Sequence, residues 1–212
     1  MIIIAHRAQD YKKEIPQRFG VEIDVYNHGG VPLMGHSPTE NSDESLSWWI
    51  YEDIHESGER PVYALNIKAD GMEEALEKQL KGRPITWIKS FCFDGSHPTM
   101  RRLKNLHVQV AERISEEEPY RGHSHIIWLD RWDWVDGEGP VPGRGQTATG
   151  KICNVPLISQ DNIPTEIYAV SPELHIPNCQ PSFRNYWWRR FQEMGCAGIC
   201  TDHWLECEEF LK

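Results

Sequence analysis

The 212-residue sequence contains no C-x-x-C pair, and no apolar run approaches the ~20 residues of a membrane-spanning helix. Several of its six cysteines lie in apolar strand-like segments, which is typical of reduced, buried thiols rather than of a disulfide framework. The apolar start at residues 1–5 is too short for the core of a signal peptide and lacks a basic leader. We therefore expect a cytoplasmic protein without stable membrane insertion.

Basic residues are fewer than acidic ones. The chain has 22 Lys and Arg residues and 32 Asp and Glu residues, which gives a formal net charge of −10. This balance repels polyanions, so it argues against a nucleic-acid partner or an anionic membrane. Any anionic small-molecule substrate must be attracted by a local cationic site. The charged fraction of 25% and the hydrophobic fraction of 39% are ordinary for a soluble globular protein.

Short apolar segments alternate with amphipathic or polar segments along most of the chain, and the apolar ones are nearly continuous, as in parallel strands buried on both faces. The pattern predicts strands at 2–5, 20–26, 62–67, 86–93, 107–111, 125–129, 167–170 and 198–200. It predicts helices at 10–18, 44–53, 72–81, 99–104, 115–118 and 183–194. This α/β order predicts a single, small (β/α)8 TIM barrel over residues 1–212, with some helices shortened or replaced by loops.

The stretch 131–164 is rich in glycine and proline and is the poorest match to a helix. We predict a long loop within the barrel, either a lid or a disordered excursion.

Polar residues are enriched where the predicted strands end, and this rim carries the active site in (β/α)8 barrels. The residues concerned are His6, Arg7, Glu22, Asp24, Asn66, Lys68, Asp94, Arg113, Asp130, Glu173, His175 and Asp202. A strand end needs no charge for folding, so this enrichment predicts a functional site.

Glu22 and Asp24 are two residues apart on one predicted strand, so their side chains point to the same side. Two carboxylates placed in this way can bind one hard cation such as Mg²⁺ or Ca²⁺. The alternative is a polar outer face of the strand. The apolar neighbours Val21, Ile23 and Val25 mark the opposite face as buried and favour the metal site.

His6 and His36 each end an apolar run, and Arg7 follows the first of them. A guanidinium can grip a phosphate in two places. Cleavage of a phosphodiester needs one group to accept a proton from the nucleophile and another to donate one to the leaving alkoxide, and imidazole titrates near neutrality. The alternatives are a core histidine with a structural arginine at 6 and 7 and a turn histidine at 36.

Several of these segments together resemble the glycerophosphodiester phosphodiesterase family of phospholipase C-like phosphodiesterase barrels. They are Ala5-His6-Arg7, Glu22-Ile23-Asp24, Gly35-His36, Leu65-Asn66-Ile67-Lys68 and Gly198-Ile199-Cys200-Thr201-Asp202. The segments at 64–71, 128–130 and 170–175 look like a bacterial subgroup of that family. The resemblance implies His6 and His36 as the acid/base pair, Arg7 and Lys68 on phosphate, and Glu22 and Asp24 on a divalent metal.

Three positions depart from the family pattern: Ala8 follows the His-Arg pair, Ser37 follows His36, and Asn66 replaces a metal carboxylate. Asn66 is a neutral and weaker metal ligand, for which Asp94 or Glu173 is a candidate substitute. These departures motivate a rival hypothesis, a barrel that binds a phosphorylated sugar or lipid headgroup without hydrolysing it. A sugar-handling enzyme that uses Glu22 and Glu173 would leave Arg7 and Lys68 superfluous.

Overall fold

The computed structural model describes residues 1–10, 14–37, 45–81, 89–115, 124–131 and 165–212. The chain forms two compact units, residues 2–111 and residues 112–212 together with Met1. The predicted Gly/Pro-rich loop lies, from residue 132 to residue 164, outside the described residues.

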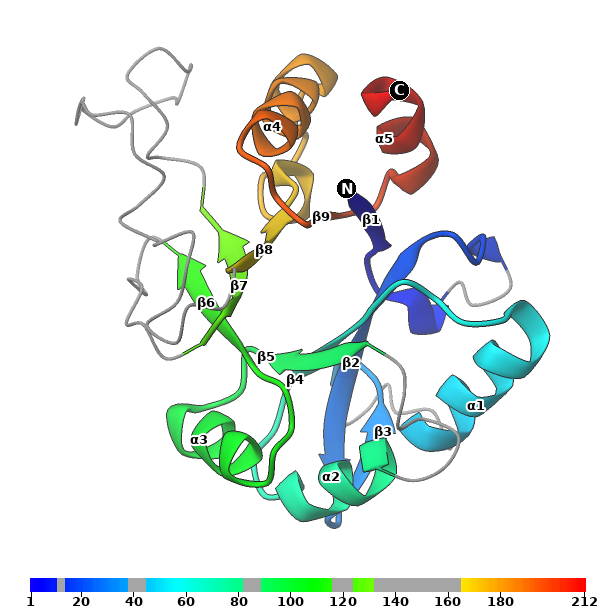
Figure 1. Ribbon diagram of the computed structural model, residues 1–212, viewed down its shortest axis with the longest axis vertical. Coiled ribbons are helices and arrows are strands. Elements are labelled where there is room, and N and C mark those ends of the chain that lie inside the picture. Colours follow the sequence, from blue (N-terminus) through cyan, green and yellow to red (C-terminus); the bar gives the residue numbers. More distant parts are fainter. Residues whose placement is uncertain (11–13, 38–44, 82–88, 116–123, 132–164) are drawn as a thin grey trace. The chain divides into compact units, whose positions relative to one another are not determined.

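The unit at residues 2–111 is built on four parallel strands. These are β1 (Ile2–Ala5), β2 (Gly20–His28), β4 (Tyr63–Ile67) and β5 (Ser90–Phe93). Their order across the sheet follows the chain, as it does in a barrel. The unit's helices are η1 (Ala8–Asp10), α1 (Leu46–Ser57), α2 (Glu73–Lys81) and α3 (His97–Asn105). The three α-helices lie along one side of these strands (Figure 1).

A hairpin extends β2 beyond its parallel neighbours. β3 (Val31–Met34) runs antiparallel to the end of β2, with Val25 opposite Met34. Gly29 and Gly30 both have positive φ in the connecting turn, a conformation that suits glycine. The hairpin returns the chain from the carboxyl end of β2 to the middle of that strand, beside Asp24 and Val25, and it thereby sets the position of the residues that follow Met34.

A buried ion pair joins α1 to β4 in this unit. Arg60 and Asp53 form two hydrogen bonds, Nε to Oδ2 at 2.7 Å and Nη2 to Oδ1 at 2.8 Å. Tyr63 donates its hydroxyl to Asp53 Oδ2 at 2.8 Å, and Arg60 also donates to the carbonyls of Ile15, Pro16 and Phe19. Burial raises the pKa of Tyr63, and the charge of Asp53 raises it further, so the phenol stays a donor.

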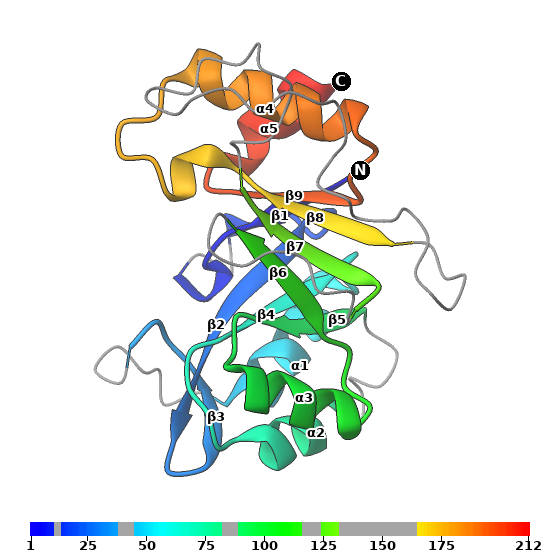
Figure 2. The ribbon, with the colours of Figure 1, turned by 90° about the vertical axis from the view of Figure 1, so that its left-hand side faces the viewer.

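The unit at residues 112–212 carries the second set of strands, in chain order across the sheet. These are β6 (Ala111–Ser115), β7 (Ile126–Asp130), β8 (Glu166–Val170) and β9 (Gly198–Thr201). β8 pairs in parallel with both β7 and β9. Its helices are η4 (Pro172–Leu174), α4 (Pro181–Glu193) and α5 (Trp204–Leu211), and Figure 2 shows α4 and α5 side by side.

The predicted fold class, a small α/β fold of the (β/α)8 type, is confirmed. The described residues supply eight barrel strands and five α-helices, and the first strand is followed only by the short helix η1. β4 and β7 are buried along their whole length, which explains their continuous apolar sequences.

Two predicted elements are misplaced. The strand predicted at 107–111 is displaced, because His107, with φ +60°, and Val108 form the turn that closes α3, Val110 makes only a parallel bridge to Cys92, and β6 begins at Ala111. Arg113 therefore lies within a strand and does not follow one. The α-helix predicted at 10–18 is wrong in its described part, since Asp10 ends the 3-10 helix η1, Glu14 has 3-10 geometry, residues 15–18 form a bend and a turn, and Pro16 has no N–H to donate.

Other boundaries differ less. The helix predicted at 115–118 begins on the last residue of β6, and its other residues lie outside the described ranges. α5 was not predicted, and β3 forms a hairpin strand in addition to the predicted barrel strands.

The five cysteines in the described ranges are free thiols, as predicted, and Cys153 lies outside those ranges. Among the helices that the structure describes, none is both long and apolar enough to span a bilayer.

The Arg60 network predicts a strong stability defect for Asp53→Ala. This change leaves the Arg60 guanidinium buried without its carboxylate, which costs about 3–5 kcal/mol. Urea unfolding should show a correspondingly lower free energy of unfolding. Glu74→Ala is the control, because Glu74 pairs with Arg102 on the surface, and we expect a much smaller loss. Equal losses in the two variants would contradict the role given to the buried pair.

Candidate active site

β2 buries two carboxylates on the same side of the strand. Glu22 and Asp24 are each 1% exposed, and the intervening Ile23 is fully buried on the other side. Parallel pairing with β4 sets Asp24 opposite Asn66. The alternative of a solvent-exposed polar face is therefore wrong for this strand.

Glu22 lies against the end of β1. The backbone N–H of Arg7 donates to Glu22 Oε2 at 2.9 Å, and His6 Nε2 lies 4.0 Å from the same oxygen. Arg7 has a left-handed φ of +49°, an uncommon conformation that aims its N–H at the carboxylate. Burial raises the pKa of Glu22 and the charge of Asp24 raises it further, while His6 and the Arg7 amide act in the opposite direction.

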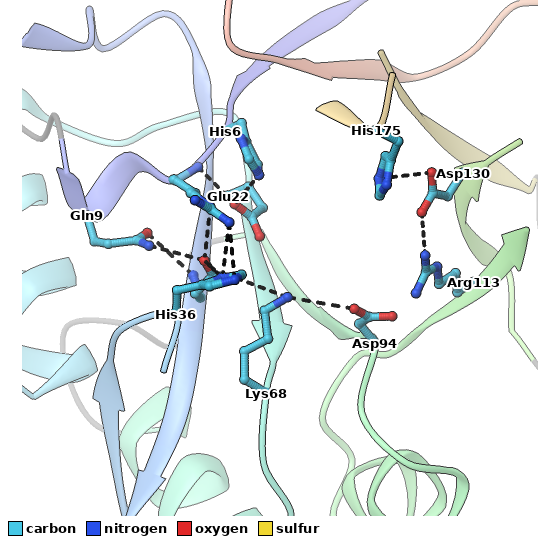
Figure 3. Close-up of polar contacts among 11 residues, drawn as sticks. His6, Gln9, Glu22, His36, Lys68, Asp94, Arg113, Asp130 and His175 are labelled. Carbon is cyan, nitrogen blue, oxygen red and sulfur yellow. Dashed lines mark hydrogen bonds and ion pairs between the residues drawn. The ribbon is translucent and has the colours of Figure 1, made fainter. Parts of the chain in front are cut away.

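Asp24 is the centre of a second set of contacts, and its partners His36, Gln9 and Lys68 are labelled in Figure 3. His36 Nδ1 lies 3.1 Å from its Oδ2, Arg7 Nε lies 3.6 Å from the same oxygen, and Lys68 Nζ lies 3.3 Å from its Oδ1. Gln9 donates Nε2 to Oδ2 at 3.3 Å and accepts from the backbone N–H of Asp24 at 3.4 Å. Three cationic or titratable side chains thus share one buried carboxylate.

Gln9 was missed at the sequence level. Residues 10–18 were expected to form a helix, and nothing in the local pattern marks Gln9 as a partner of Asp24. It lies in η1, and this short turn brings its amide group back toward β2. The one sequence feature that could have drawn attention to Gln9 is its position two residues after Arg7.

The β2–β3 hairpin brings His36 to the site. The N–H of Gly35 donates to the carbonyl of Asp24 at 3.1 Å, and His36 follows directly. Nη2 of Arg7 lies 3.2 Å from both ring nitrogens of His36, so the guanidinium is packed against the imidazole. The ring therefore contacts a carboxylate and a guanidinium, while 44% of the side chain remains exposed.

Lys68 and Asp94 follow the next two strands. The N–H of Lys68 donates to the carbonyl of Val25, which continues the β2–β4 pairing by one residue. Lys68 Nζ lies 3.8 Å from Asp94 Oδ2, and Asp94 has a left-handed φ of +66° directly after β5. Lys68 therefore lies between two carboxylates, those of Asp24 and Asp94.

The unit at residues 112–212 holds the remaining rim candidates. Asp130 ends β7 and contacts Arg113 and His175. Glu173 accepts hydrogen bonds from the hydroxyls of Ser171 and Thr201, and Asp202 is exposed after β9.

The side-chain oxygens of Glu22 and Asn66 are of the chemical type that binds a hard divalent cation. Glu22 Oε1 and Asn66 Oδ1 are buried and accept no hydrogen bond, and such orphaned acceptors are costly unless a cation or donor compensates them. Among the described residues, no three His, Cys, Asp or Glu side chains gather as a ligand group. The candidate set is instead two carboxylates and one amide, a weaker donor set than three carboxylates.

In comparisons with known proteins, no family model matches the chain and no curated protein matches it. Any assignment of function therefore depends on the residues and their geometry. These define an α/β protein of the (β/α)8 type with two histidines, an arginine and a lysine around a buried carboxylate pair.

The raised pKa of Glu22 predicts how stability depends on pH. A carboxyl group whose folded-state pKa is raised favours folding while it stays protonated, and this contribution is lost as the pH rises from the ordinary value of 4.5 through the folded value. In metal-free buffer, Glu22→Gln should be more stable than the wild type at neutral pH, and the difference should shrink toward about pH 4. Denaturant unfolding as a function of pH measures this, with the exposed Glu209→Gln as control. A less stable Glu22→Gln protein at neutral pH would contradict the prediction.

Proposed function

We propose that the protein hydrolyses a small phosphodiester with a bound divalent cation, in the manner of glycerophosphodiester phosphodiesterases. The observation that carries the proposal is the gathering of His6, His36, Arg7 and Lys68 around Glu22 and Asp24. Two titratable rings, two phosphate-binding cations and two buried carboxylates are the groups this chemistry requires. The free thiols of the described cysteines support a reducing compartment such as the cytoplasm.

The charge balance of the site supports the need for a metal. The three carboxylates of Glu22, Asp24 and Asp94 face two cationic side chains, Arg7 and Lys68. With neutral histidines this group has one net negative charge, which repels a phosphodiester. With a divalent cation on Glu22, Asp24 and Asn66 the net charge becomes positive by one, which matches the single negative charge of a phosphodiester. Such a cation would supply Lewis-acid polarisation of the phosphoryl oxygen.

The side chains of the chain itself then have distinct tasks. Arg7 and Lys68 bind the phosphoryl oxygens and stabilise the charge that develops in the transition state. Asp24 holds His36 through Nδ1, so the nitrogen for proton transfer is Nε2, which lies 3.2 Å from Arg7 Nη2. His6 lies beside Glu22, with Nε2 4.0 Å from Oε2, and is the second ring available for proton transfer. One ring accepts the proton of the nucleophile, and the other protonates the leaving alkoxide.

Replacing either histidine should abolish most of the turnover. His6→Ala and His36→Ala are each expected to lower kcat by about 10²- to 10⁴-fold, the usual contribution of one acid or base. The assay is metal-dependent release of alcohol from glycerophosphodiesters, or of nitrophenol from a chromogenic diester. His203→Ala is the matched control, because this partly exposed histidine contacts only the helical Glu206 among the ion pairs of the described residues.

Unchanged turnover in both variants would refute the assigned acid/base chemistry. A wild-type protein that binds a phosphodiester at this site but never releases alcohol would favour the rival, a binding protein for a phosphorylated headgroup. Calorimetric titration with the diester, run beside the activity assay, separates these two outcomes.

Asn66 offers a direct test of the cation site. Asn66→Asp adds a third carboxylate and should tighten Mg²⁺ or Ca²⁺ binding on the order of tenfold, whereas Asn66→Ala removes an oxygen ligand and should weaken it. Isothermal titration calorimetry of the metal-free protein measures both changes. Asn105→Asp, which adds the same charge at the exposed end of α3, should leave the affinity unchanged. Identical affinities in all four proteins would exclude Asn66 as a ligand.

A further inference from the structure

A second buried aspartate orients an arginine and a histidine in the unit at residues 112–212 (Figure 3). Asp130 is the last residue of β7 and is 5% exposed. Its Oδ2 lies 2.6 Å from Arg113 Nη2, and its Oδ1 lies 3.2 Å from His175 Nε2. The side chains of Arg113 and His175 are 30% and 47% exposed. One carboxylate therefore positions two polar groups that solvent can reach.

The backbone that carries His175 is held by a separate hydrogen-bond network. Glu173, two residues earlier, accepts hydrogen bonds from the hydroxyls of Ser171 and Thr201. Trp188 of α4 donates Nε1 to Ser171 Oγ at 2.7 Å. The turn η4 is thus tied to β9 and α4, and His175 extends from a well-supported turn. Side chains of binding sites are commonly supported in this way by a second layer of contacts.

The charge of this cluster differs from that of the site on β2. Arg113 and Asp130 cancel, so with a neutral imidazole the three residues have no formal charge. Their sequence neighbours include Glu112, Arg131 and Glu173, which add no net positive charge. In a protein of net charge −10, such a cluster does not attract a phosphate dianion. Its hydrogen-bonding groups suit an uncharged polar ligand better.

We propose that Arg113, Asp130 and His175 form a binding site for a neutral polyol with adjacent hydroxyl groups. When Nε2 of His175 carries the proton and donates to Asp130, Nδ1 is an acceptor, and Arg113 has only donors. A hydroxyl can donate to the imidazole while its neighbour on the next carbon accepts from the guanidinium. The inference goes beyond the proposed hydrolysis and does not rest on it, because it concerns binding alone.

The test observes the histidine rings of the full chain by ¹H–¹³C NMR, with the signal of His175 assigned from its absence in His175→Gln. Glycerol should shift the His175 signal saturably. 1,3-Propanediol, which lacks adjacent hydroxyls, should bind about fivefold more weakly, as expected from the loss of one hydrogen bond. Arg113→Lys keeps the charge but loses the planar donor group, and glycerol should bind to it about tenfold more weakly.

Two controls make the result specific. Circular dichroism should show that Arg113→Lys is folded, and His203→Gln, which removes another partly exposed histidine of this unit, should bind glycerol as the wild type does. The proposal is overturned if glycerol produces no saturable shift, if 1,3-propanediol or Arg113→Lys binds equally well, or if inorganic phosphate shifts His175 at lower concentration than glycerol. The first of these outcomes would leave the cluster a purely structural ion pair.

Discussion

The site on β2 depends on one constraint, the burial of two like charges two residues apart on a single strand. A carboxylate that is removed from water without compensation costs several kcal/mol, and Glu22 and Asp24 are both nearly inaccessible. The surrounding residues supply this compensation. The Arg7 amide and His6 face one carboxylate, and the other is contacted by His36, Lys68, Gln9 and the Arg7 side chain. The same groups that neutralise the buried charge are those that phosphodiester chemistry would use.

The architecture of the unit at residues 2–111 makes this compensation possible. Parallel strands run in register, so residues that follow β1 and β4 lie beside Glu22 and Asp24 in the middle of β2 without long connections. The β3 hairpin adds His36 from a segment that is not a barrel strand. Away from this edge, the Asp53–Arg60 pair ties α1 to the segment before β2 and to β4. The polar groups of the candidate site and the groups of this buried ion pair are thus separated along the strands.

Each unit uses the same arrangement, a buried aspartate that orients an arginine and a histidine. Asp24 holds Arg7 and His36, and Asp130 holds Arg113 and His175. The two sets differ in the charge around the aspartate. Asp24 also contacts Lys68, and a second carboxylate, that of Glu22, lies near it on β2. Electrostatics, rather than residue type alone, therefore distinguishes the site proposed for a cation and a phosphate from the site proposed for a neutral ligand.

Much of the fold could be predicted from the sequence, because buried parallel strands such as β4 and β7 require continuous apolar segments and these are visible directly. The same-side placement of Glu22 and Asp24 follows from the two-residue period of a strand. The sequence could not place β6, because the turn at His107 depends on how α3 closes, nor reveal Gln9, whose partner is fifteen residues away. The sequence by itself determined most of the barrel strands and the residue types near their ends. Only the tertiary structure decided which of these side chains meet, because the contact of His36 with Asp24 depends on the register of the β2–β3 hairpin, and that of His175 with Asp130 on packing between segments that are distant along the chain.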